Sequence, residues 1–196
     1  YTEINIVLNK NGKIKTIEAK KGNVTRTFTL IRAMNGGTEE NPVTLDVTSG
    51  KELVLGSGVF EIPANETKSV AELTIKGNGS TELSVVDDPY GLDTQLLYVG
   101  ESACNITIEG VNFIGTEKDW GILGGFQTKN VTIKDCTFEG LRNGIYLNGC
   151  TGGTIENCTF IDCGVGIGQL TGELEFIDCD FDSDAGIGVP AKYEDN

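Results

Sequence analysis

Histidine is absent from this 196-residue chain, and methionine and tryptophan occur only once each. Without histidine, the protein lacks the commonest general base and metal ligand of proteins. No apolar run reaches the roughly 18 residues that a membrane-spanning helix needs, so we expect no membrane insertion. Only four prolines accompany 27 glycines, and valine, isoleucine, threonine and phenylalanine gather in short runs. This composition predicts a β-rich chain with many tight turns and without long helices.

Positive charge is also scarce. The chain has 15 Lys and Arg against 29 Asp and Glu, which gives a formal net charge of -14. Because phosphate backbones and anionic membranes attract basic surfaces, we expect no nucleic acid and no membrane surface as a partner. The chain starts at Tyr1 without methionine or a signal-like apolar stretch, as in a mature, processed protein.

Glycosylation sequons indicate an extracellular or cell-surface protein. Three of these sequons lie within a repeat, where asparagine and threonine also suit turns and strands. Part of the high number of sequons is therefore one repeated pattern that is counted three times. We expect a glycoprotein with at least one of these asparagines modified. The predicted sites are Asn23, Asn65, Asn78, Asn105 and Asn130, and Asn157 opens a further sequon.

A repeat dominates the C-terminal two thirds of the sequence. NVTIKDCTF, which ends at Phe138, returns as TIENCTF ending at Phe160, and related copies end at Phe113 and Phe181. These phenylalanines are 25, 22 and 21 residues apart. Apolar residues alternate within each half of a copy, which predicts two short strands with one buried face. The break between the halves holds residue types that tolerate a left-handed or bulged backbone: Gly110, Asp135, Asn157 and Asp178.

A third short strand follows each phenylalanine. An isoleucine recurs at the equivalent position of this strand in four copies, at Ile122, Ile145, Ile167 and Ile187. A unit of three strands and three bends cannot bury its apolar side alone. Stacked units would form parallel, in-register sheets with columns of Val/Cys, Phe and Ile inside.

This unit resembles the right-handed parallel β-helix of the pectate-lyase-like superfamily, and the bend at Asp135 and Asn157 is similar to its asparagine ladder. The resemblance covers about Leu73 to Val189. It implies an all-β fold, a right-handed parallel β-helix (solenoid) of about five coils with an irregular N-terminal β cap. We expect residues 1–62 to form that cap or an intermolecular strand, and residues 63–196 to form the solenoid. The fold says little about chemistry, because enzymes, adhesins and phage spikes share such coils.

Three cysteines occupy one column of the repeat. Cys136, Cys158 and Cys179 share a position with Val111, which indicates an inward core site for small apolar side chains. Neighbouring in-register strands seldom offer disulfide geometry, so stacked free thiols are favoured. Three further cysteines lie outside the column, and the sequence leaves a disulfide among them open: Cys104, Cys150 and Cys163.

The expected catalytic surface carries no acid or base. Enzymes that resemble this superfamily hold their working residues on the outside of the third strand, where pectate lyases need calcium-binding acids and an arginine base. Glycoside hydrolases of similar fold need clustered aspartates and histidine. We therefore predict a protein without catalytic residues, and we expect Arg142 to form a surface salt bridge. The positions predicted to face outward are Gly121, Leu123, Gly144, Tyr146, Gly166, Gly168, Gly186 and Gly188.

Two other groups are candidate sites. Asp180, Asp182 and Asp184 alternate along one strand and form a candidate Ca²⁺ site, although they equally suit a solvated acidic edge. No other cofactor is expected. Trp120 starts a third strand, Tyr146 lies in the equivalent strand one coil on, and the two form a candidate carbohydrate-binding patch. The alternative is that Trp120 only covers the loop beneath it.

Together these features predict a non-catalytic extracellular β-solenoid, adhesin-like or structural. Its partners would be further copies of itself or another surface protein. The alternating strand TEINIVLN and the repeat that runs almost to the C-terminus favour head-to-tail assembly into a filament. A monomeric domain of a larger surface protein is the other form that these features suit. The alternative function is a β-helix protein that binds or cleaves polysaccharide.

Overall fold

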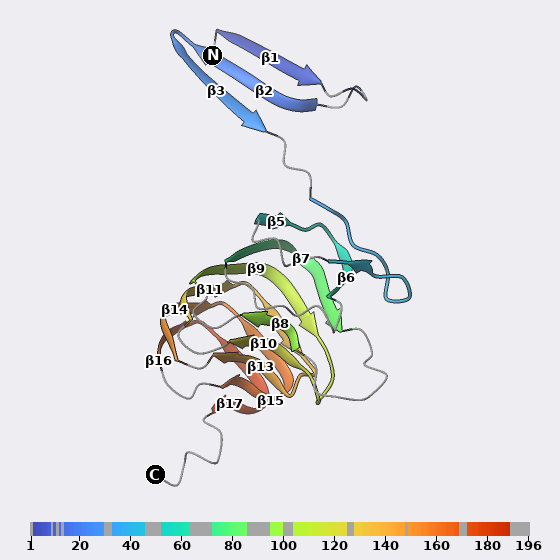
Figure 1. Ribbon diagram of the computed structural model, residues 1–196, viewed down its shortest axis with the longest axis vertical. Coiled ribbons are helices and arrows are strands. Elements are labelled where there is room, and N and C mark those ends of the chain that lie inside the picture. Colours follow the sequence, from blue (N-terminus) through green and yellow to red (C-terminus); the bar gives the residue numbers. More distant parts are fainter. Residues whose placement is uncertain are drawn as a thin grey trace. The chain divides into compact units, whose positions relative to one another are not determined.

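The structure is a computed structural model in which two compact units are described separately, Tyr1–Ala33 and Met34–Asn196 (Figure 1). Its described residues form strands, turns and bends but no helix, and hence none able to cross a membrane. The residues that the structure describes are 2–8, 10, 12, 14–29, 33–45, 52–62, 72–85, 95–99, 104–124, 128–147, 149–168 and 172–188.

The first unit is a three-stranded antiparallel sheet in the order β1-β2-β3. Its strands are β1 (Glu3–Leu8), β2 (Ile14–Lys21) and β3 (Val24–Thr29). Apolar residues alternate along β1, so the pairing of Ile6 with Ile17 places both side chains on one face. A tight turn at Gly22, with φ 59°, joins β2 to β3.

The second unit is built from parallel strands. The strands that start it are β4 (Val43–Thr44), β5 (Glu52–Val54), β6 (Gly58–Ile62), β7 (Leu73–Val85) and β8 (Gln95–Val99). The central strands are β9 (Cys104–Ile114), β10 (Trp120–Gly124), β11 (Lys129–Lys134), β12 (Thr137–Glu139) and β13 (Asn143–Leu147). The last strands are β14 (Cys150–Glu156), β15 (Thr159–Gly168), β16 (Gly172–Ile177) and β17 (Asp180–Gly188).

These strands stack as the three sides of a solenoid (Figure 1). The first side runs β16-β14-β11-β9-β7-β5, the second β17-β15-β12-β9-β7-β6-β4, and the third β8-β10-β13-β15-β17. The all-β solenoid predicted from the repeat is confirmed. Parallel pairing already joins β4 to β6 and β6 to β7, so stacked strands begin before residue 63, where we had expected the solenoid to start.

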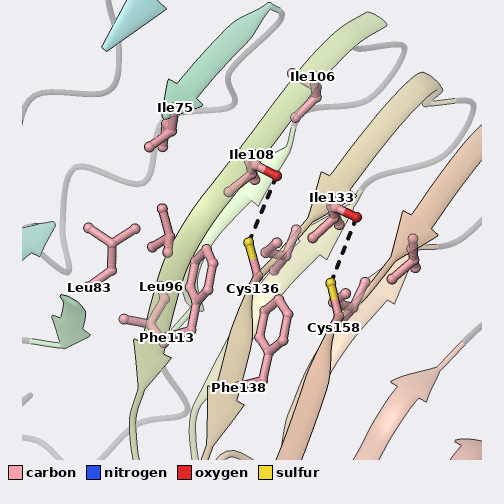
Figure 2. Packing of buried hydrophobic residues seen from close by; sticks show 14 of the residues in the cluster. Ile75, Leu83, Leu96, Ile106, Ile108, Phe113, Ile133, Cys136, Phe138 and Cys158 are labelled. Carbon is pink, nitrogen blue, oxygen red and sulfur yellow. Dashed lines mark hydrogen bonds between the residues drawn. The ribbon is translucent and has the colours of Figure 1, made fainter. Parts of the chain in front are cut away.

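The core consists of in-register columns of like side chains (Figure 2). Phe113, Phe138 and Phe160 have no exposed surface, and the Phe column continues to a half-buried Phe181. The ring centroids of successive phenylalanines are 4.8, 5.0 and 4.9 Å apart, with interplanar angles of 7–8°. The predicted Phe column is therefore a stack of parallel rings through the solenoid.

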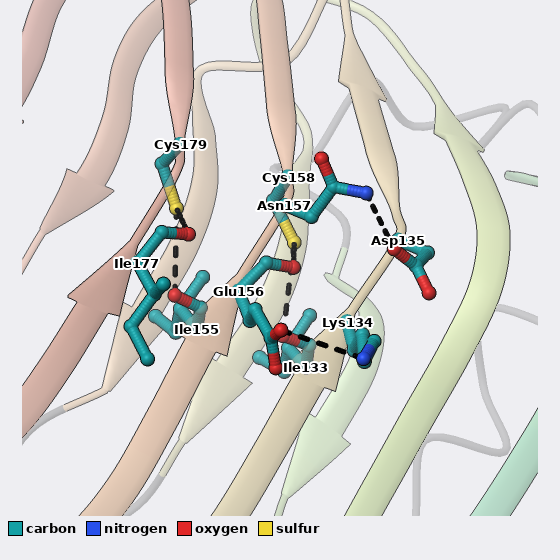
Figure 3. A network of polar contacts seen from close by, with 9 residues as sticks. All are labelled: Ile133, Lys134, Asp135, Ile155, Glu156, Asn157, Cys158, Ile177 and Cys179. Atoms are coloured by element: carbon teal, nitrogen blue, oxygen red, sulfur yellow. Dashed lines mark hydrogen bonds and ion pairs between the residues drawn. The ribbon is translucent and has the colours of Figure 1, made fainter.

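The predicted left-handed bends are confirmed. Gly110, Asp135, Asn157 and Asp178 have φ values of 67°, 53°, 51° and 50°. The Asn157 amide donates a hydrogen bond to the Asp135 carboxylate, and Figure 3 shows this contact beside the Lys134–Glu156 ion pair. Short polar side chains that bond across coils suit a position where most residues are strained.

A second left-handed column lies near the start of the first strand of three successive coils. Asn105 and Asn130 have φ values of 59° and 52°, and Nδ2 of Asn130 donates to Oδ1 of Asn105 at 3.3 Å. Gly152 follows them in the next coil with φ 69°. In these three coils the first strand therefore bends at a polar or glycine residue near its start as well as at its end.

The cysteine column holds free thiols. Cys136, Cys158 and Cys179 each donate to a backbone carbonyl of the preceding coil, with Sγ···O distances of 3.5–3.8 Å (Figures 2 and 3). Cys150 and Cys163 are also buried free thiols, so these two do not form a disulfide with each other. The side chain of Cys104 lies outside the described residues.

Candidate functional site

The third side of the solenoid differs from the outer surface that the sequence suggested. A Cβ atom on Gly144 would lie 2.7 Å from the Gly166 carbonyl oxygen and 2.7 Å from Cδ1 of Phe160. Equivalent contacts with Phe138 and Phe181 surround Gly121 and Gly166. These glycines pack against the Phe column, and their predicted outward orientation was wrong. Their lack of a side chain lets the rings approach the backbone.

Three polarisable side chains meet on this third side. Trp120 starts β10, Tyr146 lies in β13, and Arg142 lies in the bend that leads into β13. The Trp120 and Tyr146 ring centroids are 5.2 Å apart at an interplanar angle of 90°. The Arg142 guanidinium carbon lies 5.5 Å from the centroid of the Trp120 ring, which is cation–π geometry. We call Trp120, Tyr146 and Arg142 the aromatic cluster.

A buried carboxylate fixes the backbone around this cluster. Asp119 is 6% exposed, and its Oδ2 accepts hydrogen bonds from the Thr116 amide at 2.8 Å and the Thr116 hydroxyl at 2.6 Å. The Asp119 carbonyl accepts the Arg142 amide hydrogen at 2.9 Å, one coil along. Because Asp119 directly precedes Trp120, this network ties the start of β10 to the Arg142 bend.

Glycine supports the other edge of the cluster. A Cβ atom on Gly168 would lie 2.6 Å from Cδ2 of Tyr146, so the Tyr146 ring lies over the backbone of the next coil. Trp120 and Tyr146 are half-buried and Arg142 is exposed. Two anchored rings beside a planar cation form a surface suited to ligands that combine apolar faces with oxygen acceptors.

The sequence predicted two members of this cluster and missed the third. Trp120 and Tyr146 were expected to lie together, and the structure brings them into contact. Arg142 was expected only as a surface ion-pair partner. The sequence signal that could have placed Arg142 in the cluster was its position as the only arginine of the repeats, four residues before Tyr146.

The comparisons with known proteins agree with this architecture. Residues 120–196 match the family model described as right handed beta helix region. The second unit is a right-handed parallel β-helix. No curated protein and no solved structure matches the chain.

The candidate Ca²⁺ site lies on the last strand of the β-helix. Asp180 and Asp182 are exposed there and pair with Thr159 and Ile161, whereas the side chain of Asp184 lies outside the described residues. Within the described part of the chain, no three His, Cys, Asp or Glu side chains gather as a metal site. Calcium binding stays a prediction.

Of the described predicted glycosylation sites, one lies in a turn and three lie within strands. Asn23 is exposed in the β2–β3 turn, and the exposed Asn78 donates from Nδ2 to the Ser57 hydroxyl at 3.1 Å. Asn105 and Asn130 form the second left-handed column, and Asn65 lies outside the described residues. Glycosylation of these residues stays a prediction.

Proposed function

We propose that this β-helix is a non-catalytic, adhesin-like extracellular module that binds a polysaccharide through its aromatic cluster. The observation that carries the proposal is the contact of Trp120 with both Tyr146 and Arg142 on the third side. The fold alone does not decide between binding and catalysis. These three side chains supply contact area and hydrogen-bond donors, which favours binding of a ligand over catalysis.

The chemistry of the cluster suits a sugar. A pyranose ring presents an apolar C–H face to an aromatic ring, while its hydroxyl oxygens accept hydrogen bonds from a guanidinium group. With a net charge of -14, the chain repels polyanions at low ionic strength. We therefore favour a neutral polysaccharide over a polyuronate.

The single tryptophan makes this proposal directly testable, because selectively excited tryptophan fluorescence reports only on Trp120. Titration with neutral glucans, xylans and mannans should change this emission, and polygalacturonate should do so less. We expect Tyr146→Ala and Arg142→Gln to raise Kd by about tenfold or more, a loss of about 1.4 kcal/mol each. Leu123→Ala is the matched control, because Leu123 lies in β10 and pairs with Tyr146 without adding an aromatic ring. Unchanged affinities in both cluster variants would refute the proposal.

The same incubations test the catalytic alternative. We expect polysaccharide chains to keep their length after prolonged contact with the protein. Shortened chains or new reducing ends, absent with a heat-denatured sample, would replace the non-catalytic proposal with that of a polysaccharide-cleaving enzyme.

Self-association into a structural filament is a second proposed function. It is favoured by one observation: Leu174, Phe176 and Phe181 in the last coil are only half-buried, whereas Phe160 one coil earlier is fully buried. Light scattering with negative-stain microscopy, with and without a calcium chelator, tests it. Regular polymers would support a structural role, and a monomer at every concentration would rule it out.

A further inference from the structure

The first unit exposes one apolar sheet face. Residues that pair across antiparallel strands share a face, so Ile4 with Ala19, and Ile6 with Ile17, lie on the same side. Ile4 and Ile6 are 62% and 56% exposed, values unusual for isoleucine in a folded sheet. Both side chains are therefore largely exposed on the described sheet. The residues of this sheet face are Ile4, Ile6, Leu8, Ile14, Ile17, Ala19 and Val24.

Basic residues surround the sheet face. Lys21 pairs with Val24 and Arg26 pairs with Ala19, so both cations lie on the apolar side and both are exposed. Residues 1–33 contain seven Lys and Arg and two Asp and Glu, a net charge of +5, and the rest of the chain therefore carries -19. The sheet is a basic unit attached to an acidic solenoid.

The last described coil of the solenoid has core side chains that are not fully buried. This coil leaves Leu174, Phe176 and Phe181 half-buried, while at the other end of the solenoid Leu55 and Phe60 are 2% and 0% exposed. Among the described strands, β16 pairs only with β14, and β17 only with β15. Unpaired edges and exposed core residues of a solenoid require a cover.

Exposed acidic side chains lie on this last described coil. Residues 172–188 contain no Lys or Arg. A surface with an apolar centre and an acidic rim complements one with an apolar centre and a basic rim. The exposed carboxylates of the last coil are Glu173, Glu175, Asp178, Asp180 and Asp182.

We propose that the sheet face of one copy covers the C-terminal end of the solenoid of the next copy. The proposal rests on the self-association proposed above and names its two surfaces. Charge complementarity and matching apolar centres identify a second copy of this chain as the occupant. Because the two surfaces differ, the contact is heterologous and repeats from copy to copy as an open filament.

The first test changes the sheet face alone. Ile6→Asp places a charge in its centre, and Val7→Asp places the same charge on the opposite face of the same strand. We expect Ile6→Asp to raise the dissociation constant at least about tenfold and Val7→Asp to change it little. Sedimentation velocity measures both. Polymers of unchanged size in Ile6→Asp would overturn the proposal.

The second test asks whether the contact is head to tail. Glu175→Lys with Asp180→Lys reverses charges at the solenoid end, where both side chains are exposed and their replacement leaves the core intact. Each variant alone keeps one functional surface and should be monomeric. An equimolar mixture with Ile6→Asp should form a species of twice the 20.9 kDa chain mass. A mixture that stays monomeric would overturn the proposal.

The assembly state of the wild-type chain distinguishes failure of this inference from failure of the self-association on which it rests. If the wild-type chain polymerises and Ile6→Asp polymerises equally well, self-association stands and the assigned surfaces are wrong. If it stays monomeric, self-association itself fails. An internal cap, in which the sheet covers the solenoid of its own chain, would produce that second result.

Discussion

The side-chain amide of Asn157 donates a hydrogen bond to the Asp135 carboxylate of the preceding coil, and both residues have a left-handed backbone. The bend therefore depends on two separate properties of asparagine. Its backbone tolerates φ near 51°, and its side chain bonds to the neighbouring coil. Two substitutions separate these properties.

Asn157→Gly removes the hydrogen bond and keeps a backbone that accepts positive φ. We expect it to lower the free energy of unfolding by about 1 kcal/mol. Asn157→Ala removes the same hydrogen bond, and its Cβ atom, which glycine lacks, is unfavourable in the left-handed region. This variant should therefore lose about 1–2 kcal/mol more than Asn157→Gly. Urea unfolding of both variants measures the difference. Equal stability of the alanine and glycine variants would show that the left-handed backbone at this bend does not limit the stability of the protein.

The Phe column predicts a gradient of stability along the solenoid. Phe160 is fully buried between Phe138 and Phe181, so Phe160→Ala should cost about 3–5 kcal/mol. Phe181 is half-buried and stacks on Phe160, so Phe181→Ala should cost about half as much. Thermal and urea unfolding give both values. Equal losses would mean that the last ring is covered in solution, as it would be inside a filament.

The repeat predicted the interior of the solenoid because stacked coils place like residues upon like. Phe138 pairs with Phe113 and Phe160, and Ile145 pairs with Ile122 and Ile167, as the spacing indicated. The register follows from periodicity, since a slip of one residue would turn each apolar side chain outward. The left-handed bends were likewise predictable from the Gly, Asp and Asn at one repeat position.

The features that the sequence did not predict lack a periodic signal. Gly144 has no side chain to show which face it occupies, and only the packed Phe160 ring shows that there is no room for a Cβ atom. The contact between Arg142 and Trp120 joins a bend to a strand of another coil, which no alternation pattern encodes. The short strand β4 carries too few residues to show a pattern before its pairing with β6 is known.

The glycine column offers a matched pair of substitutions. In Gly144→Ala, the new methyl group would meet a backbone oxygen and the Phe160 ring, both at 2.7 Å. We expect a loss of about 1–3 kcal/mol in the free energy of unfolding. In Gly186→Ala, the nearest atom is Cγ of Phe181 at 3.3 Å, so the last coil should accept the methyl group at little cost. Similar losses in the two variants would contradict the packing described for this column.

The cysteine column predicts a loss of stability in alkali. Hydrogen bonding with the Cys136 thiol, together with burial, raises the pKa of the Cys158 thiol above its ordinary value of 9.0. Burial raises the pKa of Cys179 as well. The folded protein therefore keeps the Cys158 and Cys179 thiols protonated above pH 9, whereas the unfolded chain releases their protons; the same hydrogen bond lowers the pKa of Cys136, which acts in the opposite direction.

Because the unfolded state then binds fewer protons, this contribution to stability is complete below pH 9 and declines as pH rises further. The Cys158 thiol should lower the free energy of unfolding by about 1.4 kcal/mol per pH unit once its unfolded form is ionised, a loss that the lowered pKa of Cys136 partly offsets. Urea unfolding at a series of pH values between about 8 and 10.5 measures this slope. Cys158→Val is the control, since Val111 fills the same column, and its slope should be shallower. Identical slopes in the two proteins would show that the Cys158 thiol ionises equally easily in the folded and unfolded states.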